Sequence, residues 1–418
     1  MIDFHYNLVL QPDGSAQKVL KTLLYNLPAE WEKFGIGVSY NPICWSRQKE
    51  GVKFWAVPEE RFKNWVCNKL LGLKLFTYRQ IVELLNRYRP MILHIHNRCE
   101  LVDKLLALLS YSPKVICHYH RFFNSPFIPA KAHLLIGVSK AVSNFLRQKS
   151  REKGLKIEVE TLHNPIPYDL LQYPSTPFRT FPLPNLFFSS FSTPSISHSD
   201  LSQSGFPLSL YNSNLSFKDI GSTSDLNSLP ANISPFPTDK FKRGQPLKLL
   251  FPFGNDSQKG FDRILDFILR LPEKFPFQFY IAGKIKGNLP EPLRRLNPVI
   301  TGYLSPDNYY RLLREMDLLI LPTRREAFSL SLLEGLYFGV RVIISKTGGV
   351  PEVVGEDYPL FIPPDPTDKE LERKFWEGVT LSPEVLEPYR QKILEQFNPI
   401  KVGKKLAEIY TRLVNYPG

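Results

Sequence analysis

Two stretches of this chain alternate short apolar runs with amphipathic segments, and this alternation is the strongest constraint on its fold. In residues 1–172 the runs are NLVLQ, MILHIH, KVICHYH, HLLIGVS and KIEVETLHN, and helical patterns such as SAQKVLKTLLYNL and KAVSNFLRQKS separate them. In residues 246–418 they are LKLLFPFG, FQFYIAG, PVITGY, DLLILPT, VRVIIS and PLFIPP, and KKLAEIYTRLV closes the chain as an amphipathic helix. Alternating strands and helices predict βαβ units and parallel sheets. We therefore expect an α/β protein with two tandem Rossmann-like domains, whose ligands bind in the cleft between them.

The segment between these domains, residues 173–245, has a different composition. It contains 16 Ser, 9 Pro and 9 Phe among 73 residues, without a sustained hydrophobic period. Serine and proline at this density disfavour packed helices and strands. We interpret the segment as a mostly irregular insertion or linker.

The net charge of +13 is concentrated in the N-terminal domain. Residues 1–172 contain 24 Lys and Arg against 14 Asp and Glu, whereas residues 246–418 contain 24 against 22. A basic domain suits an anionic membrane surface or a nucleic acid, or it is merely a soluble basic surface. Nucleic acid is disfavoured because no helix-turn-helix, zinc-finger or RNP pattern accompanies the charge.

The chain shows no signal for export or membrane insertion. It has no run of 18 apolar residues, and its first residues do not follow the pattern of a signal peptide. The four cysteines, Cys44, Cys67, Cys99 and Cys117, are scattered, which favours a reducing compartment and disfavours structural zinc. We expect a cytoplasmic protein.

Two glutamates eight residues apart, Glu326 and Glu334, follow the apolar run DLLILPT. In one helix they would lie about 12 Å apart, whereas hydrolytic carboxylate pairs lie roughly 5–9.5 Å apart. No D-x-D, H-E-x-x-H or similar ligand cluster accompanies them, which disfavours a metal site. A loop that leads into a helix offers free N–H groups to an anion or to sugar hydroxyls. Glu326 is thus a candidate acceptor for sugar hydroxyls, and Glu334 for a vicinal diol such as ribose.

The surrounding motif is P-T-x-x-E-A-F-x-x-x-x-L-E-G-x-x-x-G-V-x-V-I-x-S-x-x-G-G-x-P-E, residues 322–352. It resembles the donor-site signature of the retaining nucleotide-sugar glycosyltransferases of the GT-B fold, family four (group 1). FPFGNDSQKGFDRIL, FYIAGKIKG, ILHIHNR, VICHYH, LIGVSKAVSNFL and TLHNPI are similar to further segments of that family, in the same order. The resemblance covers essentially everything except 173–245. HIHNR and the PFG…KGFD loop resemble members that build bacterial surface polysaccharides, including lipopolysaccharide.

The resemblance implies roles for particular residues. Lys259 would bind the donor diphosphate, Glu326 would lie beside the donor sugar, and Glu334 would bind the ribose. His120 would contact the sugar near the reacting carbon, with His118 as the alternative on the same strand face. The remaining positions implied at the donor are Gly14, Ser15, Gly254, Asn255, Gly283, Ala327, Phe328, Ser329 and Leu330, and those on the acceptor side are Asn97 and Arg98.

The chain departs from the family at three of these positions. Asn255 stands where an arginine is usual, which removes one phosphate cation unless Arg263 or Lys284 replaces it. The first turn reads Asp-Gly-Ser where two glycines are common. Ser329 replaces a common glycine.

The activity implied is transfer of a sugar from a nucleotide diphosphate to an acceptor hydroxyl, with retention and with neither a metal nor a cofactor. The acceptor would be a glycan or a lipid-linked glycan, reached from the inner face of a membrane. Two alternatives stay open at this point. One is a nucleotide-sugar epimerase on the same fold, and the other is a non-catalytic GT-B-like binding protein, which Asn255 favours.

Overall fold

The structure is a computed structural model, and it describes residues 2–5, 15–39, 45–58, 75–97, 99–122, 126–179, 246–272 and 275–415. Residues 1–179 and 244–418 form one compact unit. The second unit, 180–243, lies outside the described residues, and so do the expected strand NLVLQ and the site candidates Gly14 and Arg98.

The N-terminal half contains an eight-stranded sheet in the order β3-β4-β2-β1-β5-β6-β7-β8. Every pairing is parallel except that β3 runs antiparallel to β4. The strands are β1 (Ile2–His5), β2 (Lys33–Ser39), β3 (Trp45–Lys49), β4 (Val52–Pro58), β5 (Ile92–His96), β6 (Lys114–Tyr119), β7 (Leu134–Gly137) and β8 (Glu158–Thr161). The helices are α1 (Ser15–Tyr25), α3 (Leu75–Tyr88), α4 (Val102–Leu106) and α5 (Lys140–Glu152).

The C-terminal half contains a six-stranded sheet in the order β11-β10-β9-β12-β13-β14, with all pairings parallel. Its strands are β9 (Leu247–Phe251), β10 (Phe277–Ala282), β11 (Val299–Gly302), β12 (Leu318–Leu321), β13 (Arg341–Ser345) and β14 (Phe361–Ile362). Its helices are α7 (Phe261–Ile268), α8 (Glu291–Arg295), α9 (Pro306–Arg314), α10 (Leu330–Tyr337), α11 (Val350–Val354), α12 (Asp368–Thr380) and α13 (Pro383–Gln396). The central strands β12 and β13 are buried at every residue, as their nearly continuous apolar runs predict for a parallel sheet covered on both faces.

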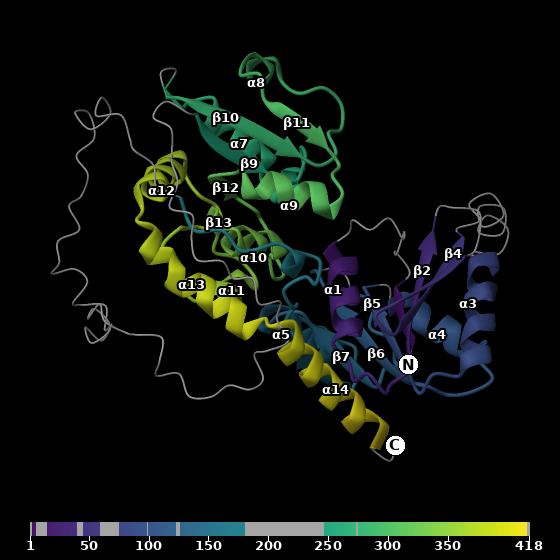
Figure 1. The fold of residues 1–418 in the computed structure, drawn as a ribbon. Helices are drawn as coiled ribbons and strands as arrows, with labels where there is room; N and C mark the ends of the chain where they lie inside the picture. The colour runs from purple at the N-terminus through teal and green to yellow at the C-terminus, as the bar shows by residue number, and fades with distance from the viewer. Residues whose placement is uncertain are drawn as a thin grey trace, which may run out of the picture. The chain divides into compact units, whose positions relative to one another are not determined.

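The closing helix α14 (Pro399–Asn415) belongs by packing to the N-terminal half. Its apolar side chains Leu406 and Ile409 share a buried cluster with Leu20 and Leu24 of α1. The yellow α14 and the purple α1 can be followed in Figure 1. Position in the sequence had grouped this helix with residues 246–418, whereas its apolar face completes the other core.

Residues 173–179, which sequence analysis assigned to the insertion, pack against the C-terminal half. Arg179 Nη1 lies 3.1 Å from Asp317 Oδ1, and the Tyr337 hydroxyl donates to the carbonyl of Tyr173 at 2.7 Å. These described residues of the expected insertion therefore contact the C-terminal half.

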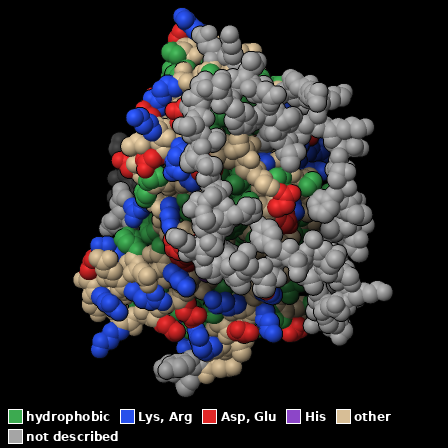
Figure 2. Space-filling model, turned by 90° about the vertical axis from the view of Figure 1, so that its left-hand side faces the viewer, with side chains coloured by type: hydrophobic (Ala, Val, Ile, Leu, Met, Phe, Trp, Pro, Cys, Tyr) green, Lys and Arg blue, Asp and Glu red, His purple; other side chains and the backbone are tan. Residues whose placement is uncertain are grey.

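Two surface properties bear on the expected partners. On the face in Figure 2, the Lys and Arg side chains of the described residues lie among Asp and Glu side chains rather than in one patch of a single sign. Within the described ranges, no helix is both long enough and apolar enough to cross a bilayer.

Candidate functional site

A cavity of about 110 Å³ brings together six of the expected site residues, including Lys259, Glu326 and His120. Val19, His120 and Asn164 line it from the N-terminal half. From the C-terminal half it is lined by Phe253, Lys259, Glu326, Phe328, Ser329, Leu330 and Ser331. A larger hollow of about 490 Å³ lies elsewhere, around Tyr111 and His133, and contains none of the residues expected at the site.

Lys259 and Glu326 form an ion pair at this cavity. Lys259 Nζ lies 2.7 Å from Glu326 Oε2 and 4.8 Å from the centroid of the Phe253 ring. Lys259 ends a short 3-10 helix after β9, and Glu326 lies in the loop after β12. The two residues meet because β9 and β12 are neighbours in the sheet, so the loops at their carboxyl ends share one edge.

The Gly348-Gly349 turn after β13 supports the loop of Glu326. Gly349 N–H donates to the Glu326 carbonyl at 3.1 Å. Gly348 has φ of 57°, and a Cβ atom there would lie 1.8 Å from the same carbonyl oxygen. Any side chain at Gly348 would therefore displace the glutamate.

The backbone conformation of Ser329 explains why a glycine is common at this position. Its φ is 75°, in the left-handed region that glycine adopts without strain. The serine offsets part of that strain by acting as the N-cap of α10, because its Oγ accepts from Leu332 N–H at 3.3 Å. Leu330 begins α10, so the first N–H groups of this helix belong to residues that line the cavity.

Glu334 is not among the residues that line the cavity. It lies on α10 with its side chain 4% exposed, and Lys18 Nζ of α1 lies 2.8 Å from its Oε1. The Tyr310 hydroxyl donates to the same oxygen at 3.2 Å, and burial, followed by the charge of Glu334, raises the pKa of Tyr310 well above its ordinary value. The expected diol acceptor is therefore occupied by two side chains in this structure.

His120 is held at the cavity from three sides. Its Nε2 lies 2.6 Å from His96 Nδ1, and its Nδ1 lies 3.1 Å from Asn164 Oδ1. Its backbone N–H donates to Asn97 Oδ1 at 2.8 Å. Asn97, expected on the acceptor side, thus fixes His120, while His118 is buried and does not line the cavity.

The loops around Gly254 and Gly283 bring β9 and β10 together. A Cβ atom on Gly254, whose φ is 60°, would lie 2.1 Å from the Lys284 carbonyl oxygen, and one on Gly283 would lie 2.8 Å from Gly254 N. Asn255 follows and bonds twice to the backbone of Lys286, at 2.7 and 2.9 Å. Its amide therefore joins two loops instead of facing the cavity.

Neither cation named as a replacement for the usual arginine lines the cavity. Arg263 donates to the carbonyls of Pro322 and Pro364 and pairs with Asp365. Of the other expected donor residues, Ala327 is buried next to Glu326 in the loop. Ser15 begins α1, and its side chain lies outside what the structure describes. Among the described residues, Lys259 is thus the cation that the cavity offers to a diphosphate.

Glu352, which had no predicted role, contacts the N-terminal half through both of its carboxylate oxygens. Its two carboxylate oxygens accept from the N–H groups of Lys140 and Ala141, at 2.7 and 2.9 Å, at the start of α5. His163 Nε2 lies 2.9 Å from Oε2. Burial alone would raise the pKa of Glu352, but the hydrogen bonds from His163 and the two N–H groups outweigh it and lower the pKa. The carboxylate caps a helix of the other half, as the dipole favours.

The sequence also did not predict the contacts that Lys18, Asn164 and His96 make at or near the site. Lys18 looks like any exposed lysine of an amphipathic helix. Asn164 lies within TLHNPI and His96 within ILHIHNR, and no role was predicted for either residue. A signal was present, since a polar residue directly after an apolar strand faces the ligand edge of a parallel sheet.

The C-terminal half contains the residues that are similar in sequence to a known protein family. Residues 248–375 match the family model of glycosyl transferases group 1. An uncharacterised 41.2 kDa protein in the cps region of Klebsiella pneumoniae is 28% identical over 112 residues, which cover 27% of this chain and 31% of that protein. The sulfoquinovosyl transferase SQD2 of Arabidopsis thaliana is 26% identical over 101 residues, 23% of this chain and 20% of that enzyme. The similarity thus spans less than a third of either curated relative.

Solved structures extend the similarity to the whole fold. HepE of Anabaena, solved with UDP and glucose, has a TM-score of 0.60 at 12% identity, with 98% of this chain and 99% of that chain covered. The sucrose-phosphate synthase of Thermosynechococcus elongatus has a TM-score of 0.63 at 13% identity, with 99% and 98% covered. The expected fold class, two Rossmann-like domains of the GT-B type, is confirmed.

Proposed function

We propose that this chain is a retaining glycosyltransferase that moves a sugar from a nucleotide diphosphate sugar to an acceptor hydroxyl. The observation that carries the proposal is the cavity where Lys259, Glu326 and His120 meet, next to the first N–H groups of α10. These groups come from segments up to about 200 residues apart in sequence and lie where a parallel sheet presents its ligands. HepE was solved with UDP and glucose, and the fold it shares with this chain supports the same donor class.

Lys259 would bind the diphosphate in this proposal. Without a ligand its ammonium is paired with Glu326 at 2.7 Å, and a diphosphate would compete for it with more negative charge. Glu326, released from the pair, would accept hydrogen bonds from the sugar hydroxyls. The N–H groups at the start of α10 would stabilise negative charge that grows on the leaving phosphate.

The cavity favours attack on the same face of the sugar. Among its described lining residues, Glu326 is the carboxylate, and in the donor complex it would be engaged by the sugar hydroxyls. A double displacement needs a carboxylate free to attack the anomeric carbon. We infer instead that the departing phosphate takes the acceptor proton, while Lys259 and α10 stabilise the charge without a metal ion.

Glu334 would bind the ribose after a change of partners. Its Oε1 is shared by Lys18 and Tyr310, so a diol must either displace Lys18 or use Oε2. We propose that the nucleoside enters as α1 moves away from α10.

The acceptor is proposed from charge and from one relative. Residues 1–172 carry a net charge of +10, which suits a lipid-linked or cell-surface glycan at the cytoplasmic face of a membrane. The Klebsiella relative lies in a cps region. We propose surface-polysaccharide synthesis, with the chain bound peripherally to the membrane.

The test is a thermal-shift panel of UDP-, GDP- and ADP-sugars against the full chain. One nucleotide class should raise Tm, Lys259→Ala should remove that shift, and Lys369→Ala, an exposed lysine on α12, should retain it. A shift that survives Lys259→Ala would place the donor elsewhere. The absence of a shift with every nucleotide would reject the proposal.

A non-catalytic donor-binding protein is the second candidate. The observation that favours it is Asn255, which binds the backbone of Lys286 where an arginine is usual. Turnover separates the two candidates. An enzyme should release nucleotide diphosphate from the stabilising donor, and Glu326→Gln should abolish that release, whereas a binding protein should retain the intact donor.

A further inference from the structure

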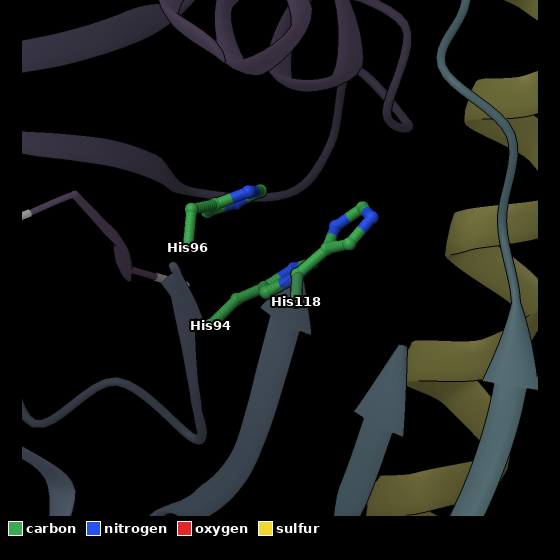
Figure 3. A group of neighbouring side chains, drawn as sticks. All are labelled: His94, His96 and His118. Carbon is green, nitrogen blue, oxygen red and sulfur yellow. The ribbon is translucent and has the colours of Figure 1, made fainter. Parts of the chain in front are cut away.

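Three histidines form a buried group beneath the cavity. His94 and His96 lie on the same face of β5, and His96 pairs in register with His118 of the neighbouring strand β6. All three side chains are almost completely buried, and Figure 3 shows their imidazole rings gathered in one group. One nitrogen from each ring can be chosen so that all three lie within 4.8 Å of one another.

The rings of His94 and His96 are held from their Nδ1 sides. His94 Nδ1 lies 2.5 Å from the Tyr410 hydroxyl of α14. His96 Nδ1 lies 2.6 Å from His120 Nε2, and the other nitrogen of His120 lies 3.1 Å from Asn164 Oδ1. Metal-binding histidines are commonly oriented in this way, by a hydrogen bond at the nitrogen that does not bind the ion.

His94 has a buried nitrogen whose hydrogen-bonding capacity the described residues do not satisfy. Its Nε2 is fully buried and has no hydrogen-bond partner among the described residues. A buried polar nitrogen without a partner destabilises a fold by about 1–3 kcal/mol. A ligand at Nε2 would remove that penalty.

We propose that His94, His96 and His118 form a binding site for a transition-metal ion of the Zn²⁺ class. Imidazole nitrogen suits Zn²⁺, Co²⁺, Ni²⁺ and Cu²⁺, whereas Mg²⁺ and Ca²⁺ require oxygen ligands that the three side chains do not offer. Three histidines leave the fourth tetrahedral position to water. None of the three histidines lines the donor cavity, and the proposal does not depend on the proposed transfer.

Binding requires a small rotation of the rings. The planes of His94 and His118 lie 18° apart, so the in-plane lone pairs of the two rings lie in nearly parallel planes and do not meet at one point. Zn–N bonds of about 2.0–2.1 Å place tetrahedral nitrogens about 3.3 Å apart. The imidazoles must therefore turn about χ2, a broad torsion, until their lone pairs converge.

The ion would position His120. His96 would bind the metal through its Nε2 and would keep its hydrogen bond to His120 through its Nδ1. A bound ion would therefore fix the rings of both residues. His120 lines the cavity. Metal binding should therefore stiffen one wall of the cavity and raise the stability of the fold.

Cobalt provides the first test. The full chain is stripped with a chelator, titrated with Co²⁺ and followed by visible absorption. The intense d–d bands of tetrahedral Co²⁺, saturating at one equivalent and lost when excess Zn²⁺ is added, support the site. Weak octahedral bands, or saturation well below one equivalent, overturn it whether or not any variant folds.

Variants locate the ion. His94→Gln and His118→Gln should each abolish the bands, whereas His133→Gln, an exposed histidine of the same domain, should retain them. Retained bands in both buried variants would overturn the assignment. Tyr410→Phe leaves all three ligands and removes only the hydrogen bond to His94 Nδ1, so Zn²⁺ affinity should fall about 10–100-fold. Unchanged affinity in Tyr410→Phe would contradict the orienting role of that bond.

Discussion

Lys18→Met is the substitution that most sharply tests how the two halves are joined. Lys18 of α1 and Glu334 of α10 form an ion pair at 2.8 Å, with side-chain exposures of 9% and 4%. Methionine retains most of the aliphatic stem and removes the charge. The variant therefore leaves a buried carboxylate with only the Tyr310 hydroxyl as a hydrogen-bond donor among the described side chains.

The expected loss of stability follows from this geometry. Coulomb attraction at 2.8 Å with an effective dielectric constant of about 20 is about 6 kcal/mol, and desolvation of both charges offsets much of it. Removing one partner of a buried pair destabilises by about 3–5 kcal/mol, because the other charge stays buried. At about 2–4 °C per kcal/mol for domains of this size, Tm should fall by about 6–20 °C.

The assay is thermal unfolding of four variants and the unmodified chain, followed by circular dichroism. Lys18→Met and Glu334→Gln should each lower Tm, and the double variant should recover most of the loss because it buries no unpaired charge. Lys21→Met, on the same helix and without an ion pair among the described residues, is the matched control. A fall below about 2 °C in Lys18→Met, or additive losses in the double variant, would refute the reasoning.

Three further substitutions test the loops around the cavity. Glu352→Gln should lower Tm near neutral pH. The pKa of Glu352 in the folded chain lies below the ordinary 4.5, so the stabilisation by its carboxylate is complete above pH 4.5 and is lost as the pH falls through the folded pKa. The Tm values of the variant and the unmodified chain should therefore converge in acid, and a constant difference would contradict this. Ser329→Gly should stabilise the fold by about 1 kcal/mol in chemical denaturation, because it relieves left-handed strain of roughly 1–2 kcal/mol and loses only a few tenths of a kcal/mol from the N-cap. Ser329→Ala retains the strain and loses the N-cap hydrogen bond, so it should destabilise by about 1 kcal/mol. Equal shifts in both variants would exclude this account. Gly348→Ala forces a Cβ atom against the Glu326 carbonyl and should weaken nucleotide binding in titration calorimetry by about tenfold or more, so unchanged affinity would show that the loop is not part of the site.

Periodicity in the sequence predicted most of the architecture. The apolar runs LKLLFPFG, FQFYIAG, DLLILPT and VRVIIS became β9, β10, β12 and β13, because residues of a parallel strand are buried on both faces and leave a continuous apolar signature. Four of the N-terminal strands, β1 to β4, were not predicted at their observed positions. β3 is also the one antiparallel strand among the described residues of its sheet, and sequence alternation does not reveal strand direction.

Part of the candidate site was also accessible from the sequence. Lys259 and Glu326 follow strands whose carboxyl ends share an edge, so their meeting follows from the α/β pattern together with the motif. Ser329 was recognised as a departure, but only its φ of 75° explains why glycine is common there. Asn255 was expected to leave a phosphate without a partner, and the structure adds that its amide joins two loops.

The contacts between residues far apart in the sequence were decided by tertiary structure. Lys18 and Glu334 are 316 residues apart, Glu352 caps a helix that begins 212 residues before it, and Tyr410 of the last helix reaches His94 across another 316. Local sequence sets the period and the ends of each helix and strand, because these depend on neighbours within a few residues. It does not determine which surfaces of two separate sheets meet, because that choice depends on the shape and charge of complete domains. The sequence alone therefore determined two α/β domains and the loops that carry Lys259 and Glu326, whereas the tertiary structure decided which side chains from the two halves meet around them.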